Sequence, residues 1–222
     1  MGVDLRGHGH STLGRADVTP SQMATDLALV IETLDLHQTV LVGYSLGGMA
    51  VQSMAIRHPE MTEARIRGLA LISTSSNLGT LRYRFGLPVA AQLPLPLSPM
   101  TGDSMLVLGA AALAAFGTDP SLFMLRRAVE AMARCPDGTR QAATAGLVGF
   151  DVSDEIADIR LPTLVLSGTR DLVIPFSHSE RIAAAIPGAS LIALPDAGHL
   201  VVWERPGELS AHIADLARRS PR

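Results

Sequence analysis

The chain has 222 residues, and 47% of them are hydrophobic, which is enough apolar material for one sizeable core. All 18 basic residues are arginine, so a Schiff-base lysine, a pyridoxal-phosphate site and a lysine-containing P-loop are excluded. The net charge is −3 and the arginines are scattered along the chain, so we expect no nucleic-acid partner.

The ends and apolar runs of the chain bear on its location. Residues 1–6 lack the basic and then apolar run of a signal peptide. The longest uninterrupted apolar stretch, residues 105–116, is shorter than the roughly 20 residues that a membrane-spanning helix needs. The single cysteine, Cys135, cannot form an internal disulfide, which fits a reducing compartment. We therefore predict a cytoplasmic protein with no membrane span.

Short apolar runs that end at glycine, serine or proline predict four buried parallel strands, at residues 39–42, 69–72, 163–166 and 190–194. Apolar residues at helical spacing predict helices at residues 23–34, 49–56, 182–186 and 209–216. This alternation of strand and helix predicts an α/β fold, with a mostly parallel sheet flanked by helices.

The segment 78–154 breaks the alternation, because it contains no convincing strand and is rich in Pro, Met, Ala and Leu. Residues 87–99 resemble a proline-rich connector, and 105–116 and 123–133 are predicted helices. We interpret 78–154 as a helical cap inserted into a core formed by residues 1–77 and 155–222. The cap could cover an apolar pocket, although methionines at helical spacing also serve plain packing.

A G-x-S-x-G pattern at residues 43–47 lies between the first predicted strand and the helix that follows it. In such a turn a serine is held in a strained conformation, and the residues two before and two after it must be almost free of side chain. Ser45 is therefore a candidate nucleophile. The backbone N–H of Leu46, at the positive end of the helix, is a candidate donor to an oxyanion.

A serine nucleophile needs a histidine base and an acid that orients it, each at the carboxyl end of a neighbouring strand. Asp171 follows the third predicted strand and His199 follows the fourth, so both side chains can emerge at one edge of the sheet. Asp196 is the rival acid, although it fits better as a cap of its turn. His178 begins the next helix and could approach the site, but it does not directly follow a strand.

The chain resembles the α/β-hydrolase family, and its esterase, lactonase and cofactor-free haloperoxidase branch most closely. The resemblance rests on the segment D-L-R-G-H-G-H-S at 4–11, the serine turn, and the order Ser45, Asp171, His199. It covers the chain outside the insertion. It implies acyl transfer to water from an ester, thioester or lactone of a small to medium apolar substrate, with no cofactor. Peroxide-dependent chemistry would use the same three residues.

Other polar clusters have simpler interpretations. Asp4, His8 and His10 could be taken for a metal site, but in the resembling family this loop is structural or lines the site, so we predict no metal. Cys135 lies in a predicted turn at 134–138, and nothing marks its thiol as activated. Arg170 fits a surface residue better than a substrate clamp.

The resemblance also implies missing parts. The segment 4–11 matches the region after the family's fourth strand, so strands 1 to 3 and a second oxyanion donor, roughly 45 to 55 residues, are expected upstream. Without them the strand at 39–42 would have an unpaired apolar edge, which could pair two copies as a homodimer. Two hypotheses follow: a serine hydrolase that has lost or lacks its start, or a catalytically impaired homologue that acts as a binding or interaction module.

Overall fold

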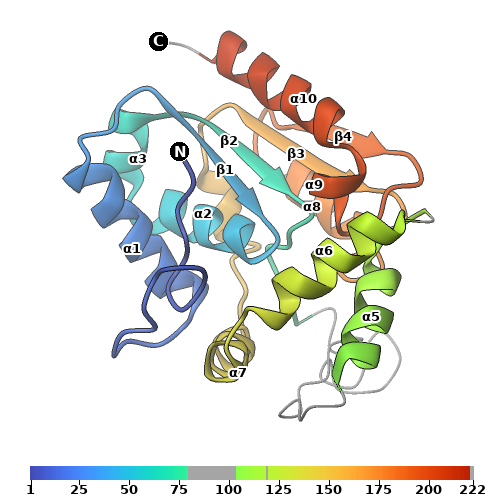
Figure 1. The fold of residues 1–222 in the computed structure, drawn as a ribbon. Helices are drawn as coiled ribbons and strands as arrows, with labels where there is room; N and C mark the ends of the chain where they lie inside the picture. The colour runs from blue at the N-terminus through green and yellow to red at the C-terminus, as the bar shows by residue number, and fades with distance from the viewer. Residues whose placement is uncertain (80–103, 119, 221–222) are drawn as a thin grey trace.

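The computed structural model describes residues 1–79, 104–118 and 120–220 (Figure 1). Four parallel strands form one sheet in the order β1-β2-β3-β4. Their bounds are Thr39–Tyr44 for β1, Ile66–Ile72 for β2, Thr163–Gly168 for β3 and Ser190–Leu194 for β4. The predicted α/β fold is confirmed. Strands β1 and β3 continue beyond their predicted C-terminal residues, and β2 begins earlier in the chain than predicted.

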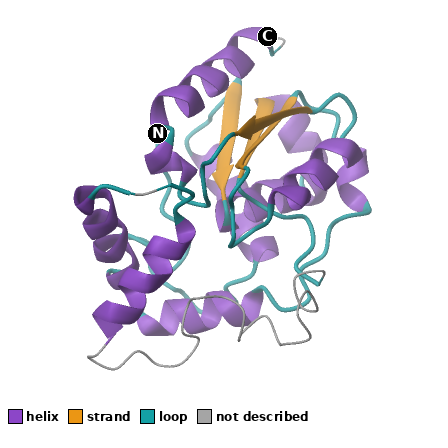
Figure 2. Cartoon of the chain, turned by 90° about the vertical axis from the view of Figure 1, so that its right-hand side faces the viewer, coloured by secondary structure: helices purple, strands orange, loops and turns teal. Residues whose placement is uncertain are grey.

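Helices cover both faces of this sheet, as the edge-on view in Figure 2 shows. On one face lie α1 (Pro20–Thr33), α2 (Leu46–Arg57), α3 (Pro59–Arg65) and α8 (Phe176–Ala185). On the other lie the short α9 (Val201–Glu204) and α10 (Pro206–Arg219). Helical spacing in the sequence predicted the four long helices and missed α3 and α9, which span only two turns or fewer.

The central strands are buried on both faces, which explains their continuous apolar sequence. In β2, Leu69 and Leu71 join the core beneath α1, α2 and α8, whereas Ile72 packs toward α9 and α10. In β3, Val165 and Leu166 divide between the two cores in the same way. The side-chain period of two thus binds two helical layers to one sheet and holds the strand ends rigidly.

The described part of the predicted insertion contains α5 (Ser104–Ala115), α6 (Leu122–Ala133) and α7 (Asp137–Gly146), and a 3₁₀ turn follows at Glu155–Asp158. The prediction of a turn over 134–138 is wrong at its end, because α7 already begins at Asp137. Pro136 directly precedes that helix, and the Asp137 carboxylate in its first turn stabilises the positive end of the helix dipole. In Figure 1 these helices lie beyond the carboxyl ends of β1 and β2.

The cap boundaries and the role of the sheet edge stay predictions. The connector predicted at 87–99 lies outside the described residues, and so does part of the boundary between the core (1–77, 155–222) and the cap (78–154). Strand β1 is at one edge of the described sheet, where Val42 is 47% exposed. Pairing of two copies at this edge is not tested by a single chain. Among the described helices, none combines the length and the apolar character needed to cross a membrane.

Candidate active site

Ser45 occupies a sharp turn between β1 and α2. Its backbone has φ +50° and ψ −118°, which is unfavourable for a residue with a Cβ and costs about 1–3 kcal/mol. The turn continues the sheet ladder, since the Ser45 N–H donates to the Ile72 carbonyl of β2 (2.9 Å). The strained residue is therefore anchored to β2, a central strand of the described sheet.

The turn requires glycine at positions 43 and 48, whereas the sequence pattern predicted positions 43 and 47. A Cβ at Gly43 would lie 2.5 Å from the Gly47 carbonyl oxygen, so position 43 must lack a side chain, as predicted. At Gly47 a Cβ would meet no described atom within 4 Å, so the expected crowding there is wrong. Gly48 is crowded instead, because a Cβ there would lie only 2.6 Å from the side chain of Thr74. The reason is that the segment after β2 packs directly on the first turn of α2.

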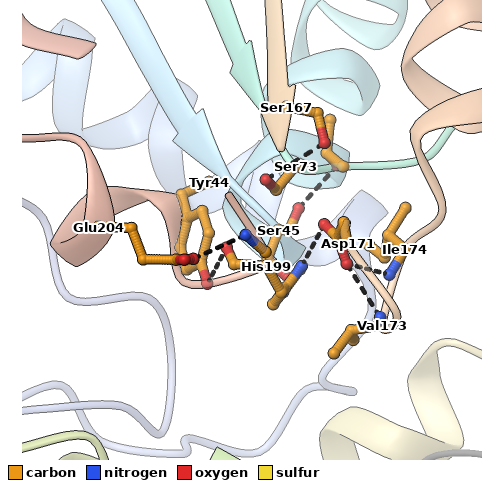
Figure 3. A network of polar contacts seen from close by, with 11 residues as sticks. Tyr44, Ser45, Ser73, Ser167, Asp171, Val173, Ile174, His199 and Glu204 are labelled. Carbon is orange, nitrogen blue, oxygen red and sulfur yellow. Dashed lines mark hydrogen bonds and ion pairs between the residues drawn. The ribbon is translucent and has the colours of Figure 1, made fainter. Parts of the chain in front are cut away.

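His199 and Asp171 meet Ser45 in one chain of hydrogen bonds (Figure 3). The Ser45 Oγ and His199 Nε2 atoms are 3.1 Å apart, and His199 Nδ1 lies 2.8 Å from Asp171 Oδ2. Asp171 and His199 are buried, at 4% and 7% exposure. The structure therefore brings together the three side chains that the sequence placed after three different strands.

The second oxygen of Asp171 has its own partners. Oδ1 accepts from the backbone N–H groups of Val173 (2.9 Å) and Ile174 (2.7 Å), so the carboxylate is held in place by the loop that follows it. An ionised carboxylate only accepts hydrogen bonds, so His199 Nδ1 carries the proton and Nε2 is left as an acceptor. That tautomer can receive the proton of the Ser45 hydroxyl.

A run of buried hydroxyl side chains, residues 73–76, follows β2 and supports the turn at Ser45. Thr74 Oγ1 donates to the Ser45 carbonyl (2.7 Å), and Ser73, with φ +43°, has its Oγ 3.5 Å from Ser167 Oγ. Thr74 was missed by sequence reasoning. The signal for it was available, because a polar run directly after a buried strand has no place in an apolar core unless its hydroxyls have partners.

Tyr44, next to the candidate nucleophile, contacts His199 from the other side. Its hydroxyl donates to the His199 carbonyl (3.1 Å), and the two rings are 5.3 Å apart. Burial and the negative charges of Asp171 and Glu204 raise the pKa of the Tyr44 phenol far above its usual range. Tyr44 therefore stays a neutral donor at any physiological pH, and it was also missed by sequence reasoning.

The alternative residues are engaged elsewhere. The carboxylate of Asp196 forms an ion pair with Arg170 (2.9 Å), and both side chains are more than half exposed. His178 is buried at the start of α8 with its Nδ1 2.6 Å from Ser75 Oγ. These contacts favour Asp171 over Asp196 as the partner of His199, and they agree with a surface position for Arg170.

The remaining candidates lie apart from this cluster. Asp4 accepts from the backbone N–H of His10 (2.9 Å), and within the described residues no group of three or more His, Cys, Asp or Glu is placed to hold a metal ion. Burial raises the pKa of the Cys135 thiol, which disfavours a reactive thiolate. Leu46 is the first residue of α2, where backbone N–H groups have no partner within the helix.

A family model and a curated relative both indicate the same protein family. The family model described as "Alpha/beta hydrolase family" matches residues 2–212. The AB hydrolase superfamily protein YisY of Bacillus subtilis is 29% identical over 231 aligned positions, which cover 98% of this chain and 80% of that protein. The chain covers a smaller share, 65%, of some longer curated relatives.

Two solved structures share the fold closely. An esterase (EaEST) from Exiguobacterium antarcticum superposes with a TM-score of 0.84 at 21% identity, covering 98% of this chain and 80% of the esterase, and this likeness concerns the fold alone. Est816, described as an N-acyl homoserine lactone degrading enzyme, superposes with a TM-score of 0.78 at 25% identity. That alignment covers 96% of this chain and 80% of Est816.

Proposed function

This chain belongs to the alpha/beta hydrolase family, and we propose that it is a serine hydrolase in which Ser45, His199 and Asp171 form the catalytic triad. The observation that carries the proposal is the unbroken hydrogen-bond chain from Ser45 Oγ through His199 to Asp171, at 3.1 and 2.8 Å. A strained serine backbone at the head of this chain supports the same role, because such strain is retained mainly at functional sites.

The mechanism that we propose is acyl transfer to water. His199 Nε2 takes the Ser45 proton as Oγ attacks the substrate carbonyl, and the resulting imidazolium is stabilised by the Asp171 carboxylate. The imidazolium then protonates the leaving oxygen or sulfur. A water molecule, deprotonated by His199, hydrolyses the acyl-enzyme and restores Ser45. In this mechanism the Leu46 N–H, at the N-terminus of α2, donates to the tetrahedral oxyanion.

For the substrate we propose an ester, thioester or lactone with a small to medium apolar acyl part. The N-acyl homoserine lactone degrading activity of Est816 supports the lactone within this class. The apolar side chains of α5 and α6, near the carboxyl ends of the strands, support an apolar group. We also propose that segment 78–154 acts as a cap over this part of the site. No cofactor enters the mechanism, because nucleophile, base and acid all come from the chain.

The test is covalent labelling of the 222-residue chain with a fluorophosphonate probe, followed by intact mass, together with hydrolysis of p-nitrophenyl butyrate. We expect one adduct per chain in the native protein and none in Ser45→Ala. The matched control is Ser53→Ala on α2, the helix that follows Ser45. Ser53 is 1% exposed and its Oγ has no hydrogen-bond partner among the described residues, so its removal should leave labelling unchanged.

Two outcomes would contradict the proposal. A folded native protein that takes up no probe and hydrolyses no ester would favour the binding-module hypothesis. Labelling that persists in Ser45→Ala would place the reactive serine elsewhere in the chain. Circular dichroism on each variant separates a chemical effect from loss of the fold.

A further inference from the structure

One carboxylate outside the proposed triad holds two distant parts of the backbone. Glu204, the last residue of α9, accepts the Gly198 N–H at Oε1 (2.8 Å) and the Gly117 N–H at Oε2 (3.0 Å). Gly198 directly precedes His199, and Gly117 follows the inserted helix α5. Figure 3 shows the Glu204 carboxylate reaching in beside His199. A single side chain therefore joins the inserted helices to the loop of the proposed base.

The two backbone segments are in direct contact at this point. A Cβ on Gly117 would lie 2.3 Å from the Ala197 carbonyl carbon, and one on Gly198 would lie 2.4 Å from the Gly117 nitrogen. Neither position tolerates a side chain. The Leu200 N–H also donates to the Ala115 carbonyl (3.1 Å). The end of α5 is therefore seated on the His199 loop by main-chain contacts, which leave little freedom for adjustment.

The carboxylate is committed to these two bonds. Among the described residues Glu204 forms no ion pair, and its neighbour Arg205 pairs with Glu208 (3.5 Å) instead. Hydrogen bonds to an ionised acceptor are roughly twice as strong as neutral ones. The arrangement needs both oxygens as acceptors, because both partners are N–H donors. A carboxamide at this position would present its own N–H to one of the two amides.

The position of His199 depends on the Gly198 peptide through the chain itself. The peptide after His199 has restraints of its own, since the Tyr44 hydroxyl donates to the His199 carbonyl and the Leu200 N–H donates to the Ala115 carbonyl. Glu204 thus secures the Ala197–Gly198 peptide, one residue before His199, and Tyr44 helps to hold the peptide after it. Because a misplacement of about 1 Å can cost on the order of 100-fold in rate, these two restraints bear directly on proton transfer.

We propose that Glu204 is a positioning residue that couples the seating of helix α5 to the placement of His199. The inference rests on the proposed function, since it assigns His199 as the base. Its consequence is that movement of α5 reaches the triad through this carboxylate, in addition to the main-chain contacts at Gly117 and Ala115. A residue with a purely structural role would lower stability but leave the chemical step of the folded enzyme unchanged.

The first test is Glu204→Gln, which keeps size and shape but removes one acceptor. The expected result is a roughly 10- to 100-fold fall in kcat and in the rate of fluorophosphonate labelling, with KM changed by less than about twofold. The matched control is Glu208→Gln, the same chemical change on an exposed residue of the next helix, with kcat unchanged. Native kcat in folded Glu204→Gln would overturn the proposal.

A second pair of variants approaches the same contact from the inserted helix. Gly117→Ala forces α5 away from the His199 loop, and we expect a similar fall in kcat although no side chain of the triad or of Glu204 is changed. Gly109→Ala on α5 is the control, because its Cβ meets no described atom within 4 Å. Equal kcat in the two alanine variants would show that the seating of α5 does not matter to the chemistry.

Amide hydrogen exchange at Gly117 and Gly198 tests the contact without measuring activity, and in the native protein it does not depend on the folding of any variant. In the native protein the Gly117 and Gly198 amides should both be protected, and Glu204→Gln should release at least one of them. Exchange of either amide in the native protein at the rate of a free loop would overturn the proposal. Absence of fluorophosphonate labelling in the native protein would instead count against the proposed function, and not against the contact of Glu204 with the two amides.

Discussion

The turn at Ser45 and the inserted helices α5 to α7 are stabilised in different ways. The turn is a strained backbone held by directional bonds from buried groups, such as those of Ile72 and Thr74. The α5–α6 pair is held by contacts between apolar side chains, and it leaves Leu122 and Phe123 85% and 73% exposed. Non-directional packing tolerates small shifts, whereas a strained turn does not.

This difference implies that the two regions respond differently to substitution. Loss of a hydrogen bond at the carboxyl ends of the strands, around Ser45, should change the chemical step. An equivalent loss in the predicted insertion should change the free energy of unfolding alone. The contact between α5 and the His199 loop is the proposed exception. Three predictions test this division, beginning with the largest expected effect.

The largest effect is expected for Asp171→Asn. The amide oxygen can still accept from Val173 and Ile174, but the amide nitrogen would face His199 Nδ1 and impose the wrong tautomer. By analogy with other Ser-His-Asp enzymes we expect kcat to fall about 10³- to 10⁴-fold with little change in Tm. Ester hydrolysis and thermal unfolding measure the two quantities.

Asp196→Asn is the matched control for Asp171→Asn, because it removes the charge of the rival acid, which lies in the loop after β4. Its partner is the exposed Arg170, so we expect kcat within about twofold of native. A loss in Asp196→Asn as large as that in Asp171→Asn would refute the assignment of the acid.

A pair of threonines compares the two regions directly. Thr74 Oγ1 donates to the Ser45 carbonyl (2.7 Å) and Thr139 Oγ1, on α7, donates to the Gly7 carbonyl (3.0 Å). Both residues are buried, at 0% and 3% exposure. Replacing each with valine leaves a carbonyl without this donor, which should cost about 1–3 kcal/mol in the free energy of unfolding in both variants.

The two valine variants should differ in activity. We expect Thr74→Val to lower kcat about tenfold, because the turn that holds the nucleophile loses a support, and Thr139→Val to leave kcat within about twofold. Urea unfolding and initial rates on the same samples provide the comparison. Equal activity losses, or none in Thr74→Val, would remove the proposed difference between the regions.

The smallest effect concerns alkaline pH. The raised pKa of Tyr44 means that the unfolded chain loses this proton near pH 10 while the folded protein keeps it. The stability from Tyr44 is therefore complete below pH 10 and declines above it, by about 1.4 kcal/mol per pH unit. The chain has no lysine, so few other groups titrate in this range.

Urea unfolding at about pH 9 and about pH 11 measures this slope, and Tyr44→Phe should remove most of it. Cys135, whose pKa is raised chiefly by burial, is the corresponding group in the insertion, and Cys135→Ser should reduce the slope less because the thiol is less deeply buried. A slope that is unchanged in Tyr44→Phe would show that another group governs alkaline stability.

Much of the fold followed from local patterns. The strands at 69–72 and 163–166 were predictable because a strand buried on both faces must be continuously apolar. The strands at 39–42 and 190–194 share that apolar pattern, although they are edge strands of the described sheet and only partly buried. Ser45, Asp171 and His199 could be named because each follows one of these strands, where parallel topology brings side chains together. Thr74 was missed although the polar run after β2 indicated buried hydroxyls with partners, and Glu204 was missed because its partners are backbone groups of distant segments that no local pattern identifies.

The sequence by itself determined the order of strands and helices, the absence of lysine chemistry and the three side chains proposed for catalysis. These follow from periodicity and residue type, which act over a few neighbours. Only the tertiary structure decided that Gly48 rather than Gly47 is crowded, that Asp171 rather than Asp196 contacts His199, and that Glu204 joins α5 to the His199 loop. Those outcomes depend on distances between segments far apart in the chain, which the packing of the sheet and helices alone determines.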